Sequence, residues 1–294
     1  MEQVTIENDV LAIKVALLGA EVQEVKSLKD NFSYIWYADA KYWGRHAPVL
    51  FPFIGRSYEN KYLIDGKEYN MKQHGFLRDQ VFKIVDKQKN KLVLQHSATE
   101  GTKLVYPYSY TVTITYTLED TYLHINYDID NNDAKDMYYS FGFHPGFNLN
   151  SDLSNYSLQF EPKLNSLPTL LVEPNPFRNG KIADTQLQNG KLELNYPMLD
   201  NGVKIYDISD IRTVSLISCR DAHQVTEDIA DFPYLAVWSP ENKKAPFLCV
   251  EPFRGLPDQY GKTIDIKDKL GEQHIAANSN DQFTVSLNFI YKND

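Results

Sequence analysis

The sequence predicts an all-β fold of antiparallel strands, either a sandwich or a barrel. Well over ten short segments alternate apolar with polar residues or form short apolar runs, and turn residues separate them. Helical periodicity is confined to two short stretches, residues 258–260 and 265–270. Aromatic residues, which favour strands, make up 13% of the chain. All-β architectures often fill such a length as one unit, and no repeat or long linker interrupts the chain, so we expect residues 1–294 to form a single domain.

The N-terminal part is expected to begin with a strand pair and a hairpin. The run from Val10 to Leu17 is apolar and β-branched, and two spaced valines after a glycine complete the pair. Residues 34–37 predict a short strand, whereas residues 41–55, dense in aromatics and prolines, predict an irregular but packed segment. Asp65-Gly66 separates two strand-like runs and supplies the positive φ angles that a two-residue hairpin turn requires.

The central part predicts a second hairpin, from residues 80–86 and 91–97, and then two long strands. Residues 111–118 alternate threonines with apolar side chains, and residues 123–129 repeat the pattern after a turn. We expect these two strands to pair antiparallel, with the apolar side chains inward and the threonines outward.

The remaining strand candidates continue to the C-terminus. They are residues 156–160, 203–208, 213–217, 234–238, 247–250 and 283–290. Residues 148–155 and 165–190 predict loops, and the second of these is long enough to border a binding site.

The charge balance excludes two classes of partner. The chain has 39 acidic and 30 basic residues, which gives a net charge of −9. Nucleic acids and anionic membrane surfaces are recognised by basic faces, so we expect neither as a partner. No run of about 18 apolar residues predicts a membrane-spanning helix, and the polar N-terminus predicts no signal peptide.

The two cysteines, Cys219 and Cys249, both lie in apolar, strand-like runs. Two buried thiols are typical of a reducing compartment, and because no Cys-x-x-Cys motif is present we expect no thiolate zinc site. We therefore expect a cytoplasmic protein. The sequence carries no signal for the oligomeric state.

The most distinctive stretch runs from Tyr139 to Phe147. Its alternate phenylalanines predict a half-buried strand that Pro145-Gly146 ends. His144 would then lie where a rigid strand opens into a loop, which is a suitable place for a functional imidazole. The simpler alternative is a histidine packed among aromatic side chains.

Three other short motifs combine strand character with an ionisable residue. His74 and Arg78 belong to Gln-His-Gly-Phe-Leu-Arg, Arg56 follows Ile-Gly, and Glu251 ends an apolar run directly before a proline. A carboxylate at the end of such a run is unfavourable unless it is exposed or paired. Each motif alone is equally typical of a turn, a surface arginine or a strand end.

Taken in order, His-Gly-Phe, Phe-Gly-x-His-Pro and a late Glu-Pro resemble the aldose 1-epimerase (galactose mutarotase) family, in particular its LacX-like branch. The resemblance covers nearly the whole chain. It implies a galactose mutarotase-like β-supersandwich with a sugar cleft on one concave sheet, and a hexose or hexose phosphate as the small-molecule partner. It implies no cofactor and no metal.

The resemblance also implies a role for each motif residue. His144 would match the general acid and Glu251 the general base, while His74 would orient the sugar. Arg56 would hydrogen-bond sugar hydroxyls and Arg78 would add a second cationic contact. The strand that carries Trp238 would border the site.

The chain departs from the family pattern at two places. Typical galactose mutarotases have a tyrosine after the catalytic His-Pro, where this chain has Gly146. They also carry a sugar-binding aspartate, which the sequence does not locate, although an aromatic at Phe232-Pro233-Tyr234 lies near the expected region.

Mutarotation itself requires this kind of residue pair. The anomeric hydroxyl loses a proton while the ring oxygen gains one, so a base and an acid must flank the C1–O5 edge of the sugar. Carboxylates titrate near pH 4.3 and imidazoles near about 6.5, which suits them to the two roles. Our hypothesis is that Glu251 deprotonates O1 and that His144 protonates O5, each contributing a factor of about 10²–10⁴.

Three other functions are compatible with parts of the sequence. A glycoside-cleaving enzyme usually needs two carboxylates, and the motifs supply one. A non-catalytic sugar-binding or sensory protein on the same fold is the main alternative. A metal site formed by His74, His144 and Glu251 has suitable ligand types but no compact ligand motif.

Overall fold

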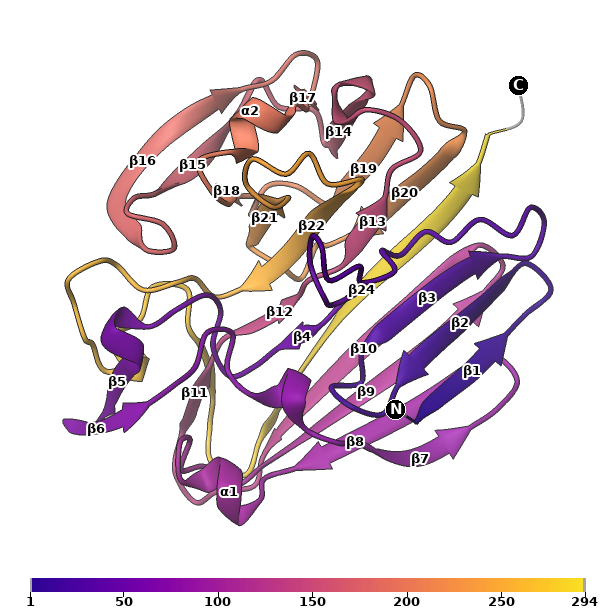
Figure 1. Cartoon of the computed structure of the whole chain (residues 1–294). Helices are drawn as coiled ribbons and strands as arrows, with labels where there is room; N and C mark the ends of the chain where they lie inside the picture. Colours follow the sequence, from indigo (N-terminus) through magenta and orange to yellow (C-terminus); the bar gives the residue numbers. More distant parts are fainter. Residues whose placement is uncertain (1, 293–294) are drawn as a thin grey trace.

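The computed structural model describes residues 2–292, and strands make up nearly all of its regular structure (Figure 1). Two large antiparallel sheets face each other, and three smaller sheets accompany them. The predicted all-β class is confirmed. Among the described residues, no helix is long and apolar enough to cross a membrane.

The first large sheet has nine strands in the order β17-β14-β19-β20-β24-β10-β9-β8-β7. Their bounds are β7 Lys83–Lys87, β8 Lys91–Ser97, β9 Tyr110–Glu119, β10 Tyr122–Asn131, β14 Tyr156–Glu161, β17 Lys191–Glu193, β19 Thr213–Ser218, β20 His223–Asp228 and β24 Asn280–Tyr291. β9 and β10 pair antiparallel over their full length, as their shared alternation predicts. The hairpin of β7 and β8 is likewise confirmed.

The second large sheet has the order β16-β15-β18-β21-β22-β12-β4, and β13 also pairs with β22. Its strands are β4 Val49–Leu50, β12 Phe141–Phe143, β13 Gly146–Asn148, β15 Ser166–Val172, β16 Arg178–Gln186, β18 Lys204–Asp207, β21 Tyr234–Trp238 and β22 Phe247–Arg254.

The smaller sheets contain seven strands: β1 Gln3–Glu7, β2 Leu11–Ala16 and β3 Val22–Ser27 in one, β5 Lys61–Ile64 and β6 Lys67–Asn70 in another, and β11 Met137–Tyr139 and β23 Gln273–Ile275 in the third. Asp65 and Gly66 both have positive φ angles, which confirms the predicted tight turn between β5 and β6. Helical structure is limited to single turns: α1 Glu100–Lys103, α2 Tyr196–Leu199, η1 Tyr58–Asn60, η2 Leu77–Asp79, η3 Leu153–Asn155 and η4 Ile266–Asp268.

The main hydrophobic core lies between the two large sheets. Phe141 of β12 contacts Tyr127 of β10 and Phe283 of β24, with ring centroids 4.5 and 4.9 Å apart. Aromatic pairs at such distances add to the burial of their apolar area. The β1–β3 sheet lies against the β8–β10 end of the first sheet, where the Tyr116 hydroxyl donates to the Ala20 carbonyl (Figure 1).

Alternate side chains of strand β22 point toward the main core and away from it. Leu248 and Val250 belong to the main core, and because side chains alternate along a strand, Cys249 and Glu251 point to the opposite face. Both faces are nevertheless buried, so this strand reads as a continuous apolar run in which Glu251 is the exception.

The predicted loop over residues 165–190 is wrong. It contains the hairpin of β15 and β16, which forms the edge of the second sheet. β16 is mostly exposed, so its side chains carry no apolar alternation. Pro168 within β15 is registered with β16 but not with β18, which agrees with the tolerance of proline near sheet edges.

Three smaller predictions are also wrong. Residues 34–37 form no strand, because only single bridges join Ser33 and Ile35 to neighbouring strands. Residues 258–260 form no helical turn, whereas residues 266–268 do. Cys219 is exposed, and Cys249 is buried as predicted. The sequence analysis did not predict strand β1 in the polar N-terminus, whose inward side chains are Val4 and Ile6.

Candidate active site

A cleft of about 500 Å³ opens on the face of the second sheet that points away from the core. That volume is in the range of small-molecule sites. All six residues singled out in the sequence line it, although they come from five separate segments of the chain: Arg56, His74, Arg78, His144, Trp238 and Glu251.

A break in the sheet brings His144 and Glu251 together. β22 pairs with β12 through Gly142 and Phe253 and with β13 through Gly146 and Cys249. The register is the same on both sides of the break, so His144 lies directly opposite Glu251. The His144 backbone N–H donates instead to the carbonyl of Pro48, at 3.1 Å.

β12 ends at Phe143, so the strand is interrupted before Pro145 as predicted, although pairing to β22 resumes at Gly146. Two other expectations about these strands need correction. His144 is not exposed in a loop but is 7% exposed, at the floor of the cleft. Glu251 does not end its strand either, since β22 continues to Arg254. Pro252 is tolerated because it lies opposite the break, where β12 and β13 offer no registered partner.

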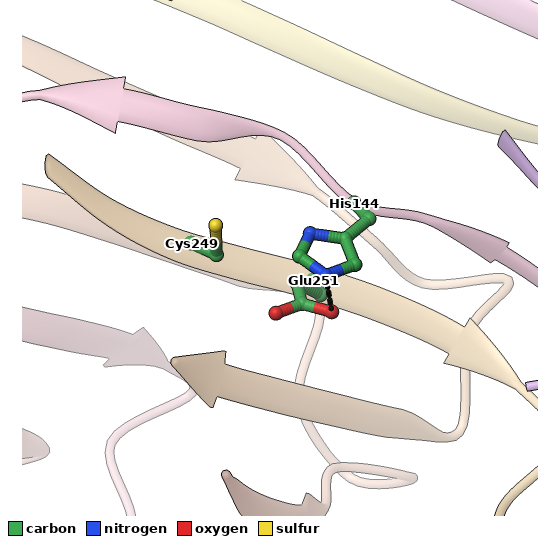
Figure 2. Close-up of side chains that lie close together, drawn as sticks. All are labelled: His144, Cys249 and Glu251. Atoms are coloured by element: carbon green, nitrogen blue, oxygen red, sulfur yellow. Dashed lines mark ion pairs between the residues drawn. The ribbon is translucent and has the colours of Figure 1, made fainter. Parts of the chain in front are cut away.

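The two side chains form a buried pair (Figure 2). Nε2 of His144 lies 3.2 Å from Oε2 of Glu251, and the side chains are 9% and 2% exposed. Burial, with a smaller contribution from Glu227, raises the pKa of Glu251 well above its usual value. Burial and the neighbouring Arg78 lower the pKa of His144 to about 3. Burial thus disfavours the charged forms of both side chains.

His74 is held in a fixed orientation beside this pair. Its backbone has a φ of 65° and that of Gly75 a φ of 69°, and a Cβ at Gly75 would lie 2.1 Å from the Phe51 carbonyl oxygen. Glycine is therefore required after this histidine. Gly55 accepts from the His74 N–H at 2.7 Å and donates its own N–H to Nδ1 at 3.1 Å.

The tautomer of His74 follows from these contacts. Burial, followed by His144 and Arg78, lowers the pKa of His74 well below 6.5, so the ring is neutral. Since Nδ1 accepts the Gly55 N–H, Nε2 carries the proton. Nε2 lies 3.3 Å from the side-chain amide of Gln73, whose oxygen must face it to accept this proton because two donors cannot pair. Both residues line the cleft, so His74 can donate its one side-chain hydrogen bond either to Gln73 or to a ligand in the cleft.

Trp43, which the sequence did not single out, covers the catalytic-site candidate His144. Their rings stack with centroids 4.8 Å apart and planes inclined by 22°. The space that Trp43 occupies depends on Gly146, where a Cβ would lie 3.2 Å from its ring and 3.1 Å from Trp36. The glycine that departs from the family pattern therefore makes room for this tryptophan.

The two arginines differ in how firmly they are held. Arg78 donates through Nη2 to the Gln73 carbonyl at 2.9 Å, and its carbonyl accepts from Arg45 at 3.4 Å. Arg56 follows Gly55, its side chain is exposed, and it borders both the cleft and an adjoining groove. The pair gives the cleft a cationic side.

A carboxylate that the sequence did not locate lies on another wall. Glu241 lines the cleft and accepts from Trp238 Nε1 at 3.4 Å and from Asn175 Nδ2 at 3.5 Å. It belongs to a loop after β21 and has no motif around it, so no sequence signal could have identified it. Asn175 lies in the β15–β16 connection, within the segment predicted to border the site.

The possible metal ligands differ from those expected. One donor atom each from His144, Cys249 and Glu251 lie within 4.8 Å of one another, and all three side chains are buried (Figure 2). His74 does not belong to this group, because its ring nitrogens face Gly55 and Gln73. A site formed by His74, His144 and Glu251 is therefore not supported.

The sequence model of the aldose 1-epimerase family matches residues 2–269. LacX of Lactococcus lactis subsp. lactis, in its plasmid-encoded form, is 28% identical over 284 residues, which cover 90% of this chain and 92% of LacX.

Solved structures are similar over the same length. A galactose mutarotase-like protein from Lactobacillus casei is 39% identical and superposes with a TM-score of 0.94 over 98% of this chain and 100% of that one. A galactose mutarotase related enzyme from Lactobacillus acidophilus is 27% identical, with a TM-score of 0.94 over 100% and 99% of the two chains. These matches confirm the galactose mutarotase-like supersandwich.

Proposed function

The chain belongs to the aldose 1-epimerase family, and on this basis we propose that it is a mutarotase that interconverts the α and β anomers of a hexose or hexose phosphate. The observation that carries the proposal is the buried His144–Glu251 pair at the floor of a cleft large enough for a hexose. The reaction class is that of an isomerase acting on a small sugar.

The pair supplies one transferable proton. A neutral carboxyl beside a neutral imidazole holds as many protons as a carboxylate beside an imidazolium. The proton can therefore move along the 3.2 Å contact between Glu251 Oε2 and His144 Nε2 without exchange with solvent. Mutarotation needs one group that donates a proton and one group that accepts a proton, and this pair provides both.

The cycle follows from this balance. In the carboxylate–imidazolium form, Glu251 takes the proton from O1 while His144 gives one to O5, and the C1–O5 bond breaks. This leaves the neutral pair, which burial favours, beside the open-chain aldehyde. After rotation about C1–C2, His144 takes the proton back from O5, Glu251 returns one to O1, and the ring closes on the other face.

The other lining residues would bind and orient the sugar. His74 donates from Nε2, and Glu241 accepts from sugar hydroxyls in the role of the family aspartate that the sequence did not locate. Arg56 and Arg78 suit either hydroxyls or a phosphate, because guanidinium groups donate to both. Trp43 and Trp238 offer apolar ring faces and edges to the pyranose.

The test measures anomer exchange by polarimetry or NMR on freshly dissolved α-galactose, α-glucose and their 6-phosphates. The wild type is compared with His144→Ala and Glu251→Gln. His274→Ala is the matched control, because His274 pairs with Asp136 at 3.0 Å on the surface, outside the cleft. Acceleration by the wild type and the control, lost in both cleft variants, supports the proposal and identifies the substrate class.

A non-catalytic sugar-binding protein predicts a different result. In that case no variant or wild type would accelerate exchange, while calorimetric titration would still detect sugar binding. The Glu251→Gln variant would then still bind the sugar, and no other measured property would change.

A further inference from the structure

The mechanism leaves one buried group beside the acid–base pair unused. The Cys249 thiol is fully buried, two residues before Glu251 on β22, and it points to the same face of the strand. Its sulfur, one nitrogen of His144 and one carboxylate oxygen of Glu251 lie within 4.8 Å of one another. Figure 2 shows the thiol on the side of the imidazole that faces away from the Glu251 contact.

Two further atoms of this group lack hydrogen-bond partners. Among residues 2–292, nothing donates to or accepts from Nδ1 of His144 or Oε1 of Glu251. The two residues are 7% and 2% exposed, so water does not simply replace a partner. Unpartnered buried polar atoms are unfavourable, and they are the atoms that a ligand at this point would satisfy.

We propose that Cys249, His144 and Glu251 bind one Zn²⁺ ion that enters from the cleft and blocks the site. Thiolate, imidazole and carboxylate are the three ligand types that zinc accepts in proteins. Three protein donors leave the fourth tetrahedral position for water, directed toward the cleft. Cations that prefer all-oxygen sites, such as Mg²⁺ and Ca²⁺, are not expected to bind here.

The present spacing is close to what zinc requires. Two donors at about 2.0–2.1 Å from a tetrahedral zinc lie about 3.3 Å apart, and a sulfur and a nitrogen lie about 3.6 Å apart. The three donor atoms lie within 4.8 Å of one another, so side-chain shifts of about 1–1.5 Å bring them to these distances.

Zinc at this position would stop mutarotation, since it would hold both the proposed acid and the proposed base. This consequence rests on the proposed function, whereas zinc binding itself does not. Inhibition should be competitive with the sugar and reversed by a chelator.

The experiment uses Cys219→Ala as the parent, because Cys219 is the exposed thiol and Cys249 then remains as the only one. Co²⁺ serves as the spectroscopic probe for zinc, and a thiolate-to-cobalt charge-transfer band in the near ultraviolet reports the sulfur ligand. The parent should show this band, and added Zn²⁺ should remove it. Cys249→Ala in the same background should lose it.

The second readout is inhibition by Zn²⁺, expressed relative to the zinc-free rate of each protein. Loss of the thiolate should raise the inhibitory zinc concentration at least about tenfold in Cys249→Ala, since even second-shell changes cost that much affinity. Cys249→Ser, which keeps the side-chain volume better, guards against a folding defect.

The proposal is overturned if the parent shows no thiolate band, or if zinc inhibits parent and Cys249→Ala equally, which would indicate an adventitious site elsewhere. Failure of the proposed function gives a different pattern. The cobalt band would still appear and disappear as described, but no sugar would show turnover to inhibit.

Discussion

The substitution Gly146→Ala tests whether the glycine after His-Pro exists to accommodate Trp43. A Cβ at this position would lie 3.1 Å from Trp36 Cβ, 3.2 Å from Trp43 Cζ3 and 3.3 Å from Phe247 Cδ2. All three distances are shorter than ordinary carbon–carbon contacts of about 3.5–4.0 Å. The Cβ of Trp36 and the rings of Trp43 and Phe247 converge on this point, so the added methyl cannot be absorbed by one flexible side chain.

The expected loss of stability is about 1–3 kcal/mol, the usual effect of one extra methyl in a packed interior. Trp43 is the most accessible of the three rings and should move, which would disturb its stacking on His144. Turnover should therefore fall together with stability. Urea unfolding with an unchanged m value measures the first effect, and anomer exchange measures the second.

Gly44→Ala is the matched control, because it adjoins Trp43 in sequence and a Cβ there would meet nothing within 4 Å. It should change stability by less than about 0.5 kcal/mol. Adding Trp43→Leu to Gly146→Ala should restore part of the loss, with a coupling energy of about 0.5–3 kcal/mol. If Gly146→Ala is as stable and active as Gly44→Ala, the packing explanation fails.

Three further predictions concern buried ionisable groups. Because the pKa of His144 is lowered to about 3, the pair gains a second proton only below that pH. Turnover should therefore fall by no more than about twofold as the pH is lowered from 7.5 to 5, and an acid limb near 6.5 would contradict the shared-proton mechanism. Burial raises the pKa of Glu227 well above 4.5, so this side chain ionises in the unfolded chain but not in the folded one, and the folded state loses stability as the pH rises from about 4.5. Urea unfolding should show that Glu227→Leu stabilises the protein more at pH 7.5 than at pH 4.5. An equal effect at both pH values would refute this reasoning. Lys269→Met should lower the free energy of unfolding by about 3–5 kcal/mol, because it leaves Asp258 buried without its cation. Lys267→Met, which breaks an exposed ion pair, should have little effect. Equal losses of stability in thermal unfolding would argue against the burial reasoning.

Strands with one buried face could be predicted from the sequence, because their side chains alternate. β9 and β10 are the clearest case, and their pairing was also correct since the turn between them is short. The hairpin of β15 and β16 could not be found in this way. β16 is exposed on most of its length, so nothing in its side chains distinguishes it from a loop.

The residues of the candidate site also differ in whether the sequence could identify them. His74, His144 and Glu251 could be singled out because their motifs, taken in order along the chain, resemble those of a known family. That His144 lies opposite Glu251 follows from the register across a sheet break, which is a property of three strands and not of either motif. Trp43 and Glu241 lie in irregular segments, where position depends on tertiary contacts and not on local pattern.

The difference between residues held on strands and residues in connecting segments bears on how the cleft would keep one reaction while its sugar preference varies. The proposed acid and base are anchored on the short link between β12 and β13 and on β22, and both are buried against the sheet. Moving either would require a change of register, which would turn Glu251 into the core. The groups that would contact the rest of the sugar, Trp43, Arg56 and Glu241, lie instead in connecting segments, where substitution alters no strand pairing. Changes in sugar preference should therefore arise at these three positions, while the acid–base chemistry depends on the sheet.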